Sequence, residues 1–176
     1  LLHSPILRAA KTEAINLSMR PPLYVHAGLI RTGSTTLQNS LFPEHSGLNY
    51  LGLPGSDQRV RTFCRNLIFE DSLYFSSAKE QRLADEILSD HSDGRPIMLS
   101  DEAFTWTKGT DRLAICKRIK EILNPDKVIL VLRNQIDAVQ SLYWMEALKT
   151  RDRNNRTLAL NEWVESMANN FERRGI

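Results

Sequence analysis

The chain has 176 residues, and 23 Lys and Arg residues nearly balance 21 Asp and Glu residues, which leaves a formal net charge of +2 at pH 7. This balance argues against a protein that binds nucleic acid through bulk positive charge. With 41% hydrophobic and 25% charged residues, the composition is that of a globular domain and excludes a disordered, fibrous or disulfide-stabilised chain.

The length predicts a single domain, over residues 1–176, with its own hydrophobic core. No run approaches the roughly 18 apolar residues that cross a bilayer, and the first residues do not form a signal peptide. We therefore expect a cytoplasmic protein without a membrane segment. The two cysteines, Cys64 and Cys116, lack the spacing of a zinc or redox site, so we expect buried, reduced thiols and no bound metal.

The first predicted element is a helix over residues 4–18, which ends before Pro21 and Pro22. Residues 23–27 are short, β-prone and bounded by Pro and Gly, which predicts a buried strand. A glycine-flanked loop over residues 28–33 follows. The Ser and Thr residues after it can cap a helix over residues 34–41.

The middle of the chain alternates amphipathic segments with short apolar runs. A connection over residues 43–55 comes first, with room for one short strand. The elements predicted here are, in order, that strand at Tyr50–Leu51, helices over residues 59–69 and 78–88, a strand over residues 96–100, and a helix over residues 113–123 that stops at Asn124 and Pro125.

Residues 127–132 form a continuous run of Lys, Val, Ile and Leu, which predicts a strand buried on both faces of a parallel sheet. A helix over residues 136–148, a charged loop over residues 151–156 and a helix over residues 160–171 complete the chain. Strands that alternate with helices predict an α/β fold with a central, mostly parallel sheet and right-handed crossovers. In such sheets, ligands bind at the carboxyl ends of the strands.

The loop after the first predicted strand carries the clearest chemical signal. Gly28 to Thr35 matches the phosphate-loop pattern G-x-x-x-x-G-K-[ST] except that Ser34 replaces the lysine. The cation of this loop, Arg31, stands inside it instead, which suits one phosphate better than a triphosphate with metal. A glycine pair alone predicts only a tight turn, but the added cation and hydroxyls favour phosphate binding. The candidate ligands are Thr32, Gly33, Ser34, Thr35 and Thr36.

A second candidate phosphate site combines Arg133, directly after the strand over residues 127–132, with Ser141 on the next helix. The planar guanidinium group fits phosphate oxygens, and the serine adds a compact donor. The alternative is a structural ion pair of Arg133 with Asp101 or Asp137.

Both segments resemble motifs of sulfotransferases that use 3′-phosphoadenosine-5′-phosphosulfate (PAPS). Residues 26–38 resemble the 5′-phosphosulfate loop, H-x-G-x-x-K-T-G-T/S-T-x-L-Q, of bacterial and carbohydrate-type members. Residues 131–143 are similar to their 3′-phosphate motif, with an Arg at a strand end and a Ser on the following helix. The resemblance covers roughly Leu23 to Tyr143.

The resemblance implies a three-layer fold like that of phosphate-loop NTPases. It also implies a metal-free transfer of the sulfuryl group from PAPS to a hydroxyl or amine, with 3′-phosphoadenosine-5′-phosphate (PAP) as product. The loop at 32–36 would hold the 5′-phosphate, Arg133 and Ser141 would hold the 3′-phosphate, and Arg31 would stabilise the leaving oxygen. Arg31 stands where the family usually has Lys. The family's C-terminal glycine-rich segment is not found, so we expect the chain to be truncated there.

The resemblance also suggests a general base, since residues 99–104 look like the S-S-E segment of bacterial members. Glu102 is the first candidate and Asp101 the second, and a helix cap or an ion pair is the structural alternative for either. His26 ends the first strand and is expected in a hydrogen-bonded core position.

Two alternatives to a sulfotransferase stay open. The chain could be a non-catalytic nucleotide-binding domain derived from one, or a phosphate-loop nucleotide kinase, which the missing lysine disfavours. The expected partner is a small-molecule or glycan acceptor, with no nucleic acid, and neither the acceptor nor the oligomeric state follows from the sequence.

Overall fold

The computed structural model describes residues 20–29, 31–52, 57–105, 111–147 and 157–173. The predicted helix over residues 4–18 and the charged loop over residues 151–156 lie outside the described residues. The chain divides into two compact units. One, here called the sheet unit, takes its residues from 1–29 and 33–131, and the other, the α7–α8 unit, from 30–32 and 132–176.

The sheet unit contains four parallel strands in the order β2-β3-β1-β4. Their bounds are β1 Leu23–Gly28, β2 Asn49–Gly52, β3 Ile97–Ser100 and β4 Lys127–Val131. In the register of the central strand, His26 lies between Ser100 of β3 and Ile129 of β4. The predicted parallel α/β sheet is confirmed, and so is each of the four predicted strands.

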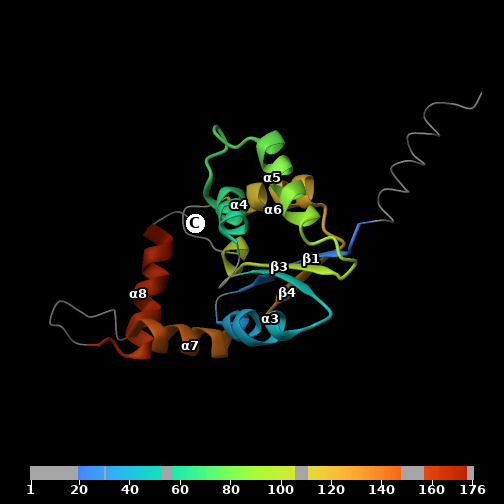
Figure 1. The fold of residues 1–176 in the computed structure, drawn as a ribbon. Helices are drawn as coiled ribbons and strands as arrows, with labels where there is room; N and C mark the ends of the chain where they lie inside the picture. The colour runs from blue at the N-terminus through green and yellow to red at the C-terminus, as the bar shows by residue number, and fades with distance from the viewer. Residues whose placement is uncertain (1–19, 30, 53–56, 106–110, 148–156, 174–176) are drawn as a thin grey trace, which may run out of the picture. The chain divides into compact units, whose positions relative to one another are not determined.

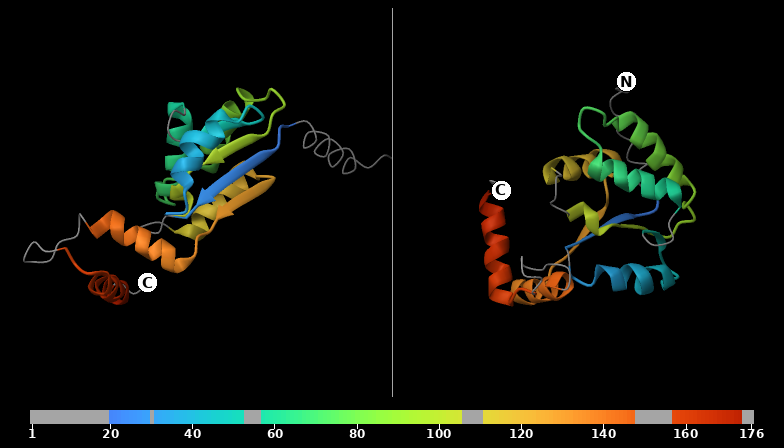
Figure 2. Two further views of the ribbon diagram at one scale, coloured as in Figure 1. Left: turned by 90° about the horizontal axis from the view of Figure 1, so that it is seen from below. Right: turned by 90° about the vertical axis from the view of Figure 1, so that its left-hand side faces the viewer.

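Helical segments cover both faces of this sheet. They are α2 (Ser34–Thr36), η1 (Leu37–Leu41), α3 (Phe42–Glu44), α4 (Gln58–Phe69), α5 (Ser77–Ser89), η2 (Glu102–Thr105), α6 (Arg112–Arg118) and η3 (Ile119–Leu123). Helices α4, α5 and α6 lie on one face, and the continuous run α2–η1–α3 lies on the other (Figures 1 and 2). The sheet unit therefore has the three layers of a phosphate-loop-like fold, with β1, a loop and a helix in the expected order.

The two faces of the sheet differ in polarity because successive residues of a strand point to opposite sides. On the face of α4, α5 and α6, the strands contribute buried apolar side chains, among them Val25, Leu51 and Leu99. The alternate residues His26 and Ser100 are buried as well, and both are polar. The main hydrophobic core thus lies on one side of the sheet, and polar groups are buried in the other half.

Side-chain caps set the beginning of the longer helices in the sheet unit. Asp57 accepts a hydrogen bond from the backbone N–H of Arg59, and Ser76 and Asp111 cap α5 and α6 in the same way. Such caps satisfy backbone donors that have no partner inside the helix. The run α6–η3 ends where Asn124 adopts a left-handed conformation, with φ 38°. These ends explain why the helix bounds agree closely with the sequence prediction.

The prediction that β4 is buried on both faces is wrong. Among the described strands, β4 has a partner on one side, β1, and lies at the edge of the sheet. Val128 is 60% exposed and Leu130 53% exposed. A continuous apolar run identifies a strand but does not fix its place in the sheet, because that place depends on which segments pair with it.

The prediction of buried thiols is confirmed for Cys64 and wrong for Cys116. Both are free thiols, but Cys64 is buried and Cys116 is exposed on α6. Burial raises the pKa of the Cys64 thiol, so this side chain behaves as a small core residue.

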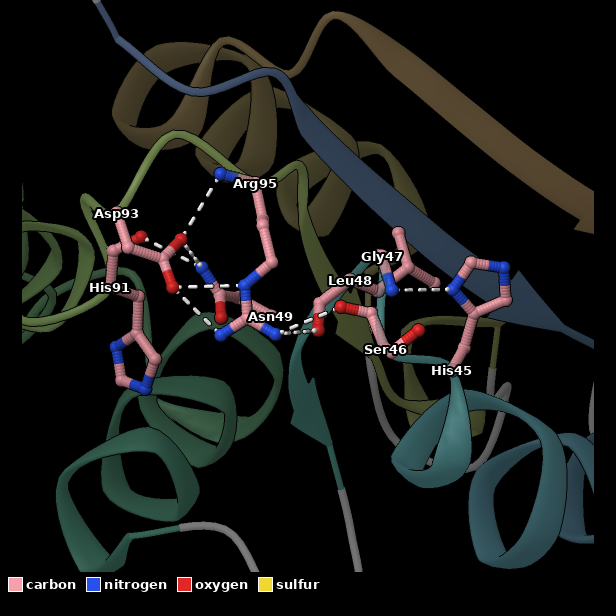
Figure 3. Close-up of polar contacts among 8 residues, drawn as sticks. All are labelled: His45, Ser46, Gly47, Leu48, Asn49, His91, Asp93 and Arg95. Carbon is pink, nitrogen blue, oxygen red and sulfur yellow. Dashed lines mark hydrogen bonds and ion pairs between the residues drawn. The ribbon is translucent and has the colours of Figure 1, made fainter.

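A hydrogen-bonded clip joins the turns that lead into β2 and β3, at the amino ends of these strands (Figure 3). Arg95 donates to Asp93 Oδ2 at 2.7 Å and to the carbonyl oxygens of Ser46 and Leu48 at 3.1 and 3.4 Å. Asn49 Nδ2 donates to Asp93 Oδ1 at 2.6 Å. All these groups partner one another, so the clip holds two turns together.

The α7–α8 unit contains α7 (Gln135–Ala147) and α8 (Leu160–Arg173), close to the predicted helices. Tyr143 donates a hydrogen bond to the carbonyl oxygen of Leu158 at 2.8 Å, and its ring meets the buried Trp163 edge to face. Throughout the described part of the chain, every helix is too short or too polar to span a lipid bilayer.

Candidate functional site

The loop after β1 turns sharply into a helix. Two residues have positive φ, Arg31 at 67° and Gly33 at 86°. The carbonyl oxygen of Gly33 accepts hydrogen bonds from the N–H groups of Thr36 and Leu37 at 3.0 and 3.2 Å, which begins the helical run. A side chain at Gly33 would meet nothing within 4 Å, so the left-handed backbone is what makes glycine favourable here.

The predicted phosphate ligands of this loop differ in exposure. Thr35 and Thr36 are exposed on the first helical turn, and Thr32 is half-buried. Ser34 is 2% exposed, so its side chain faces the interior of the sheet unit. The loop therefore offers two hydroxyls to solvent beside the positive end of a helix, an arrangement that favours anions.

Within the α7–α8 unit, the structure brings together residues of both predicted phosphate motifs. Arg31 Nε donates to Ser141 Oγ at 2.9 Å, and Arg31 Nη1 lies 3.8 Å from the sulfur of Met145. Arg133 Nη1 donates to the carbonyl oxygen of Arg31 at 3.0 Å. Two exposed arginines and a serine hydroxyl thus form one cluster, here called the arginine cluster (Arg31, Arg133 and Ser141).

This cluster bears on one alternative for Arg133, an ion pair with Asp137. In the described portion of the α7–α8 unit, Arg133 forms no ion pair with Asp137. Its guanidinium group instead donates to a neutral group, the carbonyl oxygen of Arg31. Two such arginines within one hydrogen-bonded cluster can bind an anionic group such as phosphate.

The two candidate bases follow the end of β3. Asp101 is 8% exposed, and its Oδ1 accepts a hydrogen bond from the N–H of Ala103 at 2.9 Å. Burial raises the pKa of Asp101. Glu102 is exposed and begins η2. The predicted structural alternative, a helix cap, therefore applies to Asp101.

The turn that contains these acids is hydrogen-bonded to β1. Thr105 Oγ1 donates to the carbonyl oxygen of Gly28, the last residue of β1, at 2.8 Å. The N–H of Asp101 donates to the carbonyl oxygen of His26 at 3.2 Å. Both acids consequently lie at the carboxyl end of the sheet, where α/β folds bind ligands. Arg31, in contrast, belongs to the α7–α8 unit.

The expected core position of His26 is confirmed. Its side chain is fully buried, and Nδ1 lies 2.8 Å from Ser100 Oγ. Burial lowers the pKa of His26, so the imidazole is neutral at physiological pH.

Sequence reasoning missed the partners that surround this histidine. Gln38 Nε2 donates to Ser100 Oγ at 3.0 Å, and Tyr50 also forms a hydrogen bond with Ser100. His26, Tyr50 and Ser100 each stand next to a buried apolar residue in their strand, and Gln38 lies on η1. That alternation is the signal that could have identified a buried polar face.

Comparison with known proteins finds no protein-family model and no curated protein that matches the chain. A thymidylate kinase from Candida albicans is among the solved structures that are similar to it, with 13% sequence identity and a TM-score of 0.34. The alignment covers 89% of this chain and 93% of the kinase. A likeness at this score and identity carries no argument about function.

Proposed function

We propose that this chain binds a nucleotide with two phosphate groups and transfers the sulfuryl group of PAPS to a hydroxyl or amine of an acceptor, such as a carbohydrate. The observation that carries the proposal is the hydrogen bond from Arg31 Nε to Ser141 Oγ, 2.9 Å long. It joins side chains from two motifs that are far apart in the sequence. A nucleotide with phosphates at both the 5′ and 3′ positions is the ligand that two such motifs in one protein would suit.

Each motif has a separate task in this proposal. The loop at 32–36 binds the 5′-phosphate through backbone N–H groups and the exposed hydroxyls of Thr35 and Thr36. Arg133 and Ser141 bind the 3′-phosphate, which ATP and AMP lack. Arg31 supplies the cation for the oxygen between phosphorus and sulfur.

The reaction itself requires one bond to form and one to break. The acceptor oxygen or nitrogen forms a bond to sulfur while the bond from sulfur to the phosphate oxygen breaks, and PAP leaves with the electron pair. Arg31 stabilises the negative charge that develops on that oxygen. Its guanidinium group stays charged at any physiological pH, so it can do so in place of the lysine usual in the family.

The acceptor's proton passes to a carboxylate, for which Glu102 and Asp101 are the candidates. Exposure favours Glu102, because a base must reach the attacking group. The raised pKa favours Asp101, because a stronger base accepts the proton more readily. We keep Glu102 as the proposed base. Glu102→Gln should then remove transfer activity without weakening PAP binding, whereas the same result for Asp101→Asn alone would reassign the role.

Calorimetric binding of PAP, AMP and ATP without magnesium tests the nucleotide specificity. We expect PAP to bind more tightly than AMP, and Arg133→Ala to reduce PAP affinity roughly tenfold to a hundredfold, as expected for the loss of a charge-assisted hydrogen bond. AMP affinity should stay unchanged in that variant. Arg112→Ala, which removes an exposed arginine at the start of α6, is the matched control. Equal affinity of the native chain for PAP and AMP would overturn the proposal.

A phosphate-loop nucleotide kinase is the second candidate, because the β1–loop–helix order and the positive φ of Gly33 fit that class as well. Magnesium-dependent turnover of ATP by the native chain would favour it. A non-catalytic nucleotide-binding domain is the third. PAP binding without sulfuryl transfer from PAPS, together with transfer gained by Arg31→Lys, would favour that one.

A further inference from the structure

A buried polar network lies under the helical run that begins at the phosphate loop. It consists of His26 of β1, Ser100 of β3, Tyr50 of β2 and Gln38 of η1, here called the Ser100 network. His26 is 0% exposed and Ser100 1% exposed. Burying polar groups is costly unless each finds a partner, so the arrangement needs a reason.

The hydroxyl of Ser100 uses its full hydrogen-bonding capacity. A serine hydroxyl donates one hydrogen bond and accepts two. Gln38 Nε2 donates to it, and its other two partners are His26 Nδ1 and the Tyr50 hydroxyl. His26 Nε2, on the other side of the ring, is buried and has no hydrogen-bond partner in the described residues. A saturated hydroxyl is unsuited to act as a nucleophile and well suited to hold its neighbours.

The neighbouring side chains fit closely around this network. Gly52, two residues after Tyr50, lies beneath the phenol ring, and a Cβ at Gly52 would collide with that ring. Burial raises the pKa of Tyr50 to about 12, so the phenol stays neutral. The ring of Phe42 contacts both His26 and Tyr50, with centroids 5.3 and 5.7 Å apart.

Gln38 links this network to the phosphate loop. It lies one helical turn after Ser34, and both side chains are buried on the same face of the run. The contact of Phe42 with the sheet is apolar and therefore permits small rotations and shifts. The hydrogen bond from Gln38 to Ser100 is directional, so it fixes the helix about its axis and, with it, the N–H groups of the first turn.

We propose that Gln38 and Ser100 are positioning residues for 5′-phosphate binding: their hydrogen bond holds the first turn after Gly33 at the height and rotation that the phosphate requires. This inference rests on the proposed nucleotide binding and adds to it a set of residues outside the loop. Neither side chain needs to touch the nucleotide.

Calorimetry with Gln38→Met tests the inference, because methionine fills a similar volume without donating a hydrogen bond. The ligands are PAP and adenosine 3′-monophosphate, which lacks the 5′-phosphate. We expect PAP to bind about five- to tenfold more weakly, the usual effect of one lost hydrogen bond. The affinity for adenosine 3′-monophosphate should not change. A general loss of folding would weaken both ligands alike, so this split distinguishes positioning from stability.

Asn39→Met makes a comparable change on the exposed side of the same turn and should leave both affinities unchanged. If Gln38→Met does not fold, Ser100→Ala removes the same hydrogen bond from the other side and carries the same expectation. Native PAP affinity in a folded Gln38→Met protein would overturn the inference and leave the proposed function intact. A native chain that binds neither nucleotide would overturn both.

Discussion

At the scale of single residues, Arg31 combines a strained backbone with a well-partnered side chain. Its φ of 67° lies in the left-handed region, which costs a residue with a Cβ about 1–2 kcal/mol. A glycine would remove that cost but would also remove the bonds to Ser141 and Met145. Strain that persists in a loop with a charged side chain is typical of a functional position.

Comparison of Arg31→Gly with Arg31→Ala isolates this strain, because both variants lose the guanidinium group and differ only at Cβ. We expect the glycine variant to have a free energy of unfolding about 1 kcal/mol higher than the alanine variant. Urea denaturation measures the difference. Equal stabilities would mean that Arg31 is not held in the left-handed conformation.

Asp101 gives a second prediction at the residue scale, concerning pH. Burial raises its pKa above the ordinary value of 3.8. The folded state therefore holds the proton more tightly than the unfolded state, and this group costs stability as the pH rises through 3.8 to the folded-state pKa. Asp101→Asn keeps an oxygen for the N–H of Ala103 and carries no charge. We expect its Tm to exceed the native Tm at pH 7 and to equal it near pH 3.

Calorimetric melting at the two pH values measures both quantities. A variant that is less stable than the native chain at pH 7 would show that the carboxylate is stabilised rather than penalised. If the same variant also lost sulfuryl transfer, the cost in stability would be one that the native chain bears for activity.

At the scale of elements, the clip at the amino ends of β2 and β3 joins the turn before β2 to the turn before β3 through side-chain hydrogen bonds. The Arg95 side chain contributes most to holding the pKa of Asp93 well below its ordinary value of 3.8, and the backbone N–H of Arg95 and the side chain of Asn49 contribute less. Asp93 therefore contributes stability that is fully present above pH 3.8 and is lost as the pH falls toward its folded-state pKa.

Asp93→Ala removes this contribution. We expect a Tm lower by about 2–5 °C at pH 7, and a difference from the native chain that shrinks as the pH is lowered below 3.8. The control is Asp85→Ala, since Asp85 is an exposed carboxylate on α5 that accepts a hydrogen bond from Gln81. A pH-independent difference would mean that the carboxylate charge is not what holds the clip.

At the scale of the whole molecule, strand β4 forms one edge of the sheet in the sheet unit. An exposed, apolar edge strand invites pairing with another chain, and natural proteins often protect such edges with charge. On β4, Val128 and Leu130 are more than half exposed and point to the same side. The charged residue of the strand, Lys127, is at its beginning.

Leu130→Lys places a charge in the middle of this edge. We expect slower concentration-dependent aggregation, measured by light scattering, and a change in the free energy of unfolding within about 0.5 kcal/mol. Leu73→Lys makes the same substitution at a residue that is 89% exposed and outside the strands, and it should not change aggregation. Equal aggregation of both variants and the native chain would exclude β4 as the contact.

The helices and strands of this protein follow from local features of its sequence. Hydrophobic periodicity, capping residues and Pro and Gly breaks are local signals, and local sterics and hydrogen bonds decide where a helix or strand begins and ends. The four strands, the helix after the loop and the core position of His26 were therefore predictable. The loop pattern and the Arg133–Ser141 pair identified the candidate site for the same reason.

The contacts between side chains that are distant in the sequence depend on the three-dimensional fold. The edge position of β4, the hydrogen bond from Arg31 to Ser141 and the convergence of Gln38 and Tyr50 on Ser100 all join residues that are distant in the sequence. No local propensity encodes such contacts. They depend on strand order and on how helices pack, and these follow from the burial of the whole chain's apolar surface.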